Sequence, residues 1–245
     1  MLEPCLNQAA GLQSLAPQLA PKLVAVASHG QQQGELPLLW SLCSTWVDMG
    51  LPVMVLDGHA LESEQNPGLL HMLANPMGDF HEDHEAQTWA VLPAALGFDQ
   101  LAQQGFNSHT VGGLFQNYGV VLLYADAATL TDLVKGSGLA PLLVVAPLKA
   151  SSLTAYRALK QLLLDAHLRP TVANIALVPN ASSTLSGPTQ NLQDCAMTYL
   201  GLEIKPLTVS ATASAHDSQD EINRLALQLL ESAVFLERHP QQRTH

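Results

Sequence analysis

The stretch KLVAVASHGQQQGELPLLW, residues 22–40, decides the fold class. It opens with an apolar run, Lys22–Ser28, that is typical of a buried strand. A turn containing Gly30 and Gly34 follows, and from Leu36 to Met49 apolar residues recur every three or four positions. That spacing predicts a helix with one buried face. A buried strand joined by a glycine-containing turn to such a helix indicates the first unit of a parallel α/β sheet.

The alternation continues along the chain. Further strands are expected at 52–57, 88–93, 119–124, 139–146, 171–178 and 202–209, and helices at 151–166, 190–200 and 219–237. Because several of these runs are apolar throughout, their strands should be buried on both faces. We therefore expect an α/β fold: a doubly wound, mostly parallel sheet of seven or eight strands with helices on both faces.

Composition limits the functions that the chain can have. Its 245 residues, 47% hydrophobic and 13% charged, suit one domain, 22–245, preceded by a polar arm, 1–21. The net charge of −11 disfavours nucleic acid and anionic membranes as partners. Three scattered cysteines indicate reduced thiols, and neither a signal peptide nor an apolar run of about 18 residues is present. A cytoplasmic protein without a strong membrane anchor is expected.

The turn from Ser28 to Leu36 resembles the phosphate-binding loop of the MinD/ParA class of ATPases, where a Ser precedes Gly-Lys-Gly-Gly-x-Gly-Lys-Thr. The likeness runs without a gap to Asp57 and includes Gly34 and Gly50. It implies the MinD/SIMIBI-type P-loop NTPase fold, with the first strand near the centre of the sheet. The family's metal-linked strand is similar to residues 118–126.

The residues that this family uses on ATP are replaced. Glu35 stands for the lysine that contacts the β- and γ-phosphates, Leu36 for the Mg²⁺-binding threonine and Gly30 for the signature lysine. Tyr124 stands for the metal-linked Asp, while Asp57 is kept and His59 replaces a second Asp. A carboxylate beside phosphates is repulsive. We expect a pseudo-ATPase without catalytic residue, metal or cofactor, whose vestigial nucleotide site comprises Gly30, Gly34, Glu35, Leu36, Asp57 and Tyr124.

The arm resembles a second family element, the Asp-Gln-Ala-x-x-Leu-Arg motif of FlhG (FleN), the MinD-like regulator of flagellar number and placement. Gln8, Ala9 and Leu12 match, whereas Asn7 and Gln13 stand where Asp and Arg are usual. Residues 67–70 and 89–93 are also similar to FlhG segments. In that family the arm binds the signal-recognition-type GTPase FlhF, and its glutamine stimulates GTP hydrolysis. The resemblance implies partner binding through Asn7, Gln8, Ala9 and Leu12.

Other constellations indicate less. Residues 81–85 could ligate a metal but are better explained as a solvated acidic loop. Trp40 and Trp46 follow the apolar stripe of the first helix and are expected in the core. The last predicted helix, 219–237, has a mixed polar face, which favours core packing over membrane binding.

Three functions stay open at this stage. The first is a regulator of flagellar number or placement that binds and activates an FlhF-type GTPase, contacts flagellar basal-body or switch components, and is recruited through them to the cell pole or inner membrane. The second is a divergent, active ATPase, against which Glu35 and Tyr124 argue. The third is a MinD-like scaffold of another bacterial envelope machine, such as cellulose secretion or pilus placement. Gln8 favours the first over the third.

Overall fold

A computed structural model describes residues 20–28, 32–76, 89–176, 185–210 and 216–237. The strands are β1 Lys22–Ser28, β2 Val53–Asp57, β3 Trp89–Pro93, β4 Val120–Asp126, β5 Leu142–Val145, β6 Thr171–Ala176, β7 Leu207–Ser210 and β8 Val234–Phe235. The helices are α2 Gln32–Asp48, α3 Leu69–Ala74, α4 Ala95–Gln104, α5 Ser108–Leu114, α6 Ala127–Val134, α7 Ser151–Leu164, α8 Gly187–Leu200 and α9 His216–Glu231.

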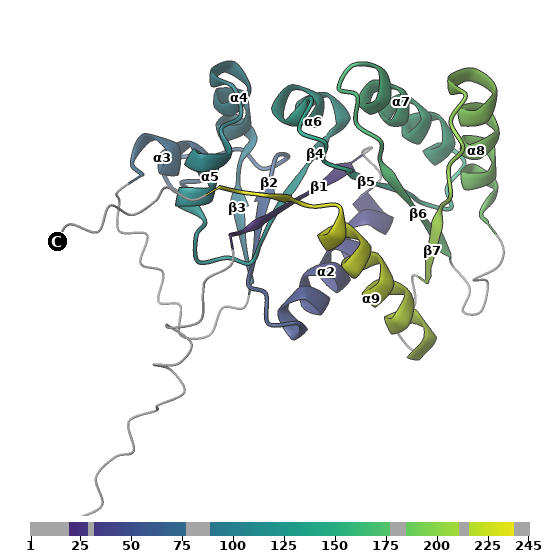
Figure 1. Ribbon diagram of the computed structural model, residues 1–245, viewed down its shortest axis with the longest axis horizontal. Coiled ribbons are helices and arrows are strands. Elements are labelled where there is room, and N and C mark those ends of the chain that lie inside the picture. The colour runs from purple at the N-terminus through teal and green to yellow at the C-terminus, as the bar shows by residue number, and fades with distance from the viewer. Residues whose placement is uncertain (1–19, 29–31, 77–88, 177–184, 211–215, 238–245) are drawn as a thin grey trace, which may run out of the picture.

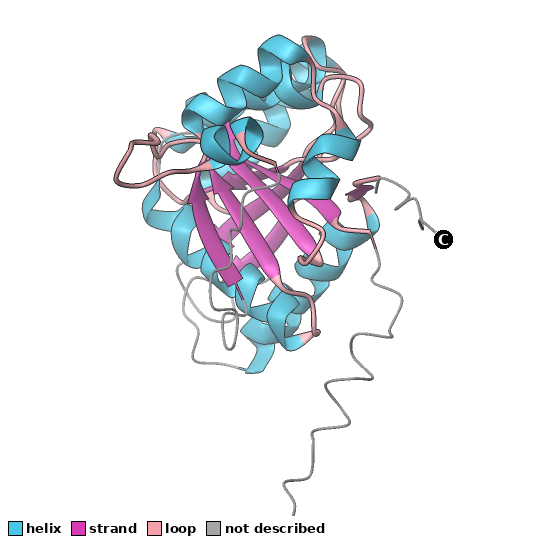
Figure 2. Cartoon of the chain, turned by 90° about the vertical axis from the view of Figure 1, so that its left-hand side faces the viewer, coloured by secondary structure: helices cyan, strands magenta, loops and turns pink. Residues whose placement is uncertain are grey.

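The strands of the described residues form one sheet of eight, in the order β3-β2-β4-β1-β5-β6-β7, with β8 paired to β1. Every pairing along that order is parallel, and the pairing of β8 with β1 is antiparallel. The first strand lies in the middle of the sheet, as expected. Helices cover both faces, with α2 and α9 on one side and α3 to α8 on the other (Figure 1; Figure 2 shows the sheet between the layers).

The alternation of side chains along β1 explains the two layers. Leu23, Ala25 and Ala27 are buried against the cluster that contains α4, α6 and α7. Val24 and Val26 are buried on the other face, against α2 and α9. Both faces of the strand are therefore dry, which is why its sequence is apolar throughout.

Some predicted boundaries were wrong. The first helix begins at Gln32, not Leu36, because its first turn is polar and carries no apolar period; Pro37 consequently lies inside it. The strands predicted at 139–146, 171–178 and 202–209 are described only as β5, β6 and β7. Apolar residues next to β5 and before β7 extend the pattern without joining the ladder, and residues 177–178 lie outside the described residues.

The predicted helix 219–237 is also corrected. It spans His216–Glu231 as α9, and the chain then turns into β8. Ile222, Leu225 and Leu229 are buried on α9, as core packing requires, whereas Leu236 is buried beyond the end of the helix. The two-residue strand β8 pairs with β1 at Lys22 and Leu23, which β5 does not pair with. Sheet pairing thus replaces the last turn of the predicted helix.

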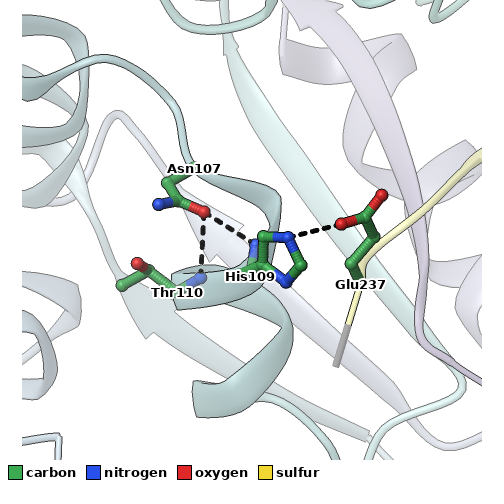
Figure 3. Close-up of polar contacts among 4 residues, drawn as sticks. All are labelled: Asn107, His109, Thr110 and Glu237. Carbon is green, nitrogen blue, oxygen red and sulfur yellow. Dashed lines mark hydrogen bonds and ion pairs between the residues drawn. The ribbon is translucent and has the colours of Figure 1, made fainter. Parts of the chain in front are cut away.

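The end of β8 is held against α5. Leu236 donates its backbone N–H to the carbonyl of Pro21 at 2.8 Å, and Glu237 forms an ion pair with the Nε2 atom of His109 (Figure 3). Asn107 caps α5 by accepting hydrogen bonds from the backbone N–H groups of His109 and Thr110. The two ends of the described domain therefore lie side by side.

The two tryptophans of α2 have different environments. Trp46 is fully buried and donates its indole N–H to the carbonyl of Ala226 in α9. Trp40, also expected in the core, is 62% exposed and meets Trp89 of the edge strand β3 edge-to-face at 4.7 Å. The expectation for Trp40 was wrong because β3 is the last strand of the sheet and leaves this side of α2 uncovered.

Candidate functional site

Several of the positions predicted from the sequence to form a nucleotide site lie together at the carboxyl ends of three adjacent strands, where open α/β sheets bind ligands. The register of β1 on β4 sets Ser28 opposite Asp126, and that of β2 on β4 sets Asp57 opposite Tyr124. Glu35 reaches the same place from the first turn of α2. The fold thus brings together Ser28, Glu35, Asp57 and Tyr124.

Glu35 is the centre of this arrangement. Its side chain is fully buried. Its Oε2 atom accepts one hydrogen bond from the Ser28 hydroxyl and one from the Tyr124 hydroxyl, both at 2.8 Å. Its place in the first turn of a helix also favours a negative charge. Two donors and a helix N-terminus are what a buried carboxylate needs to offset its loss of hydration.

Tyr124 acts as a hydrogen-bond donor. Burial raises the pKa of its hydroxyl above the usual range, and the negative charge of Glu35 raises it further, while the hydrogen bond with Ser28 lowers it. The phenol therefore keeps its proton at neutral pH. Its oxygen lies 3.4 Å from the Ser28 Oγ atom, so the three side chains form one connected cluster.

Asp57 takes part in a local turn. Its Oδ1 atom accepts the backbone N–H of His59 at 2.9 Å. The His59 ring then lies edge-on to the Tyr124 ring, with centroids 5.0 Å apart. The carboxylate kept from the family pattern is thus engaged with the turn that follows β2.

The remaining predicted positions divide into two groups. Gly34 lies in the first turn of α2, and Leu36 is 48% exposed on the same helix. Gly30 and the arm residues Asn7, Gln8, Ala9 and Leu12 lie outside the described residues, as does the acidic segment 81–85.

Sequence reasoning missed the contact between Glu35 and Tyr124. The two positions were interpreted as separate replacements, although the resemblance to the MinD/ParA class implies that both belong to one nucleotide site. The signal in the sequence was that one of these positions carries a carboxylate, Glu35, and the other a hydroxyl, Tyr124, which can form a hydrogen bond.

A second polar cluster is centred on Asn174, within β6. The Asn174 side-chain carbonyl accepts hydrogen bonds from the hydroxyls of Ser186 and Thr189, each at 2.7 Å, and its amide donates to Thr208 at 3.3 Å. These contacts fasten the start of α8 and β7 to the sheet. Asn174 therefore has a structural role at this edge.

Two further findings concern metals and membranes. Within the described ranges, His, Cys, Asp and Glu residues form no group of three or more that could hold a metal ion. None of the helices in the part of the chain that the structure describes has the length and apolar character needed to cross a bilayer.

No family model and no curated protein sequence matches the chain. Solved structures do. The MinC:MinD cell division protein complex of Aquifex aeolicus is matched at a TM-score of 0.56 and 15% identity, over 89% of this chain and 99% of that one. A complex of McdA from Cyanothece with ATP is matched at a TM-score of 0.54 and 13% identity, over 89% of this chain and 100% of that one.

A third match is the ADP- and magnesium-bound cobyrinic acid a,c-diamide synthase of Mycobacterium smegmatis. Its TM-score is 0.54 and its identity 13%, over 86% of this chain and 94% of that one. At these identities the likeness concerns the fold. The matches cover 86–89% of this chain and 94–100% of the solved chains, so the likeness extends over the parallel sheet and the helices on both of its faces. The chain therefore has the MinD/ParA-like P-loop NTPase fold.

Proposed function

We propose that the chain is a regulatory protein of the MinD/ParA-like fold that neither hydrolyses nor tightly binds ATP. The observation that carries the proposal is the buried Glu35 carboxylate and its hydrogen bonds from Ser28 and Tyr124. Phosphates placed beside Glu35 would meet a negative charge instead of a lysine. They would also compete with the carboxylate for its two hydroxyl donors. Binding would then break hydrogen bonds that Glu35 already makes, which raises the free-energy cost of binding.

Isothermal titration with ATP and Mg²⁺ tests this part. We expect no ATPase activity, and a Kd for Mg·ATP no lower than about 1 mM, which corresponds to a binding free energy of roughly −4 kcal/mol. The matched variant is Glu35→Gln, which removes the charge and keeps an acceptor for both hydroxyls. Micromolar binding by the wild type would contradict the proposal and favour the divergent ATPase.

We propose further that the protein acts through its N-terminal arm on an FlhF-type GTPase, and so on flagellar number or placement in the bacterial cytoplasm. The likeness of residues 7–12 to the FlhG arm supports this. The described domain adds that the arm joins the sheet at Pro21, whose carbonyl is fixed by Leu236. A glutamine that orients an attacking water needs only a carboxamide at the right distance, not an ATP site of its own.

The direct test measures GTP turnover by the FlhF-type GTPase of the same organism. Wild-type protein should stimulate turnover, and Gln8→Ala should lose nearly all stimulation while binding is largely kept. Gln18→Ala, in the same arm but outside the motif, is the matched control. Asn7→Asp with Gln13→Arg should tighten docking by about 1–3 kcal/mol if both restore charge-assisted contacts.

An alternative is a scaffold of another envelope machine, such as cellulose secretion or pilus placement. Deleting residues 1–20 separates the two. If neither GTP turnover nor motility changes in the deletion strain, the FlhG-like role is wrong and the scaffold takes its place. A pull-down that recovers flagellar basal-body or switch components with the wild type and not with the deletion would support the flagellar role.

A further inference from the structure

A groove of about 590 Å³ lies between α3, α4 and the loop that follows β2. We call it the α3–α4 groove. It is lined by Glu62, Ser63, Glu64, Pro67, Gly68, Leu70, His71, Ala74 and Leu96. Its floor is mainly apolar, and Leu96 is 39% exposed there. The volume lies within the range of binding clefts.

The walls of the groove are fixed by specific contacts. The Glu62 carboxylate accepts the backbone N–H groups of Leu96 and Gly97, both at 2.8 Å, and that of Leu70 at 3.3 Å. One side chain thus joins the first turns of α3 and α4. Gly68 lies so close to β3 that an added Cβ would be 2.1 Å from the Pro93 carbonyl oxygen. The groove is therefore a built feature that exists before any partner arrives.

The groove belongs to a half of the chain without basic side chains. Residues 23–134 contain twelve Asp and Glu residues and no Lys or Arg. Nine of the ten Lys and Arg residues follow residue 134. In Figure 1 the groove-forming helices α3 and α4 lie at one end of the molecule, and α7 and α8, which follow residue 134, lie at the other. The groove therefore lies in the part of the molecule built from residues 23–134, whose described segments carry exposed carboxylates such as Glu64 and no Lys or Arg.

We propose that the α3–α4 groove binds a basic amphipathic helix of a partner protein. Apolar side chains of that helix would cover Leu70 and Leu96, and a flanking Lys or Arg would pair with Glu64 at the rim, which is exposed. Helices commonly dock by laying an apolar face into such a groove. The acidic half would steer a basic partner and repel an acidic one. None of the groove-lining residues belongs to the arm, and the inference does not depend on the proposed function.

Segments of the same chain fit the groove less well by charge. Residues 77–88 contain four carboxylates and no Lys or Arg, and residues 1–19 contain no Lys or Arg. Residues 238–245 contain Arg238 and Arg243 but no large apolar side chain. A partner that supplies both apolar and basic side chains is the better match.

The probe is a fluorescein-labelled Leu/Lys peptide of about 18 residues with leucines at helical spacing, and its twin with Glu in place of Lys. Fluorescence anisotropy at physiological salt should give a Kd below about 100 µM for the Leu/Lys peptide with the full chain. The Leu/Glu peptide should show no binding. Glu64→Lys should weaken binding about tenfold or more, because it reverses the charge at the rim. Asp132→Lys, an equal charge change on α6, should weaken it less than about threefold.

The apolar part is tested in the same way. Leu96→Ser should weaken binding about fivefold or more, whereas Leu227→Ser, at a similarly exposed leucine of α9, should leave it unchanged. Equal effects of Glu64→Lys and Asp132→Lys would overturn the proposal, because binding would then be diffuse attraction. Binding only by a chain truncated after Glu237 would overturn it too, since the occupant would then be residues 238–245.

Discussion

The contact between Tyr124 and Glu35 makes a measurable prediction about stability. Tyr124→Phe removes one hydroxyl and leaves the ring, so packing is retained. The lost hydrogen bond is 2.8 Å long and ends on a fully buried carboxylate. Hydrogen bonds to charged groups contribute about 1.5–3 kcal/mol, and Glu35 would be left one donor short. We expect the free energy of unfolding at neutral pH to fall by about 2 kcal/mol.

Thermal and urea unfolding followed by circular dichroism measure this loss. A fall of about 2 kcal/mol corresponds to a decrease in Tm of about 4–8 °C for a chain of this size. Tyr156→Phe is the matched control, since among the described residues its hydroxyl has no hydrogen-bond partner, and it should change stability by less than about 0.5 kcal/mol. In a Glu35→Gln background the cost of Tyr124→Phe should drop to about 1 kcal/mol, because the acceptor is then neutral.

The pH dependence has a defined sign. Because the folded-state pKa of Tyr124 is raised, its protonated form is the one that folding favours. This contribution is complete below the unfolded pKa of about 10 and is lost as the pH rises above it. The stability difference between wild type and Tyr124→Phe should therefore narrow above about pH 10. The reasoning would be refuted if Tyr124→Phe were as stable as the wild type at neutral pH. It would also be refuted if Tyr124→Phe lowered the free energy of unfolding equally in the wild-type and Glu35→Gln backgrounds.

Three further predictions concern single sites. Burial raises the pKa of the Cys43 thiol from 9.0 to about 12. The free energy of unfolding should therefore fall by up to about 1.4 kcal/mol per pH unit between pH 9 and pH 12. Cys43→Ala should flatten this slope, as measured by urea unfolding at several pH values in that range. Gly68→Ala should lower Tm by at least about 5 °C because its Cβ would meet the Pro93 carbonyl, while Gly113→Ala, with open space around it, should be neutral; equal Tm values would contradict this. Glu62→Ala should cost about 1–2 kcal/mol by removing the acceptor for three backbone N–H groups, and Glu62→Gln should recover part of it; the check is thermal unfolding of both variants.

The sequence by itself determined the layout of the fold. Continuous apolar runs such as Lys22–Ser28 predicted strands buried on both faces, and periodic runs predicted the helices between them. These patterns are local, since each depends on which side chains a strand or helix must hide from water. The MinD/ParA-like spacing from Ser28 to Asp57 then placed the first strand at the centre of the sheet, where the structure has it. From the sequence alone we also predicted that Glu35 and Tyr124 stand at positions where the MinD/ParA class binds ATP and its metal, which stays a prediction.

The tertiary structure decided how distant residues meet. Glu35 and Tyr124 are 89 positions apart, and only the register of β1, β2 and β4 brings them within 2.8 Å. Trp40 follows an apolar period yet is exposed, because strand order leaves β3 at the edge of the sheet. The last helix ends early because β1 has an unpaired stretch that Val234 and Phe235 can complete. Pairing partners, edges and neighbours are properties of the assembled sheet, and no periodicity within one segment encodes them.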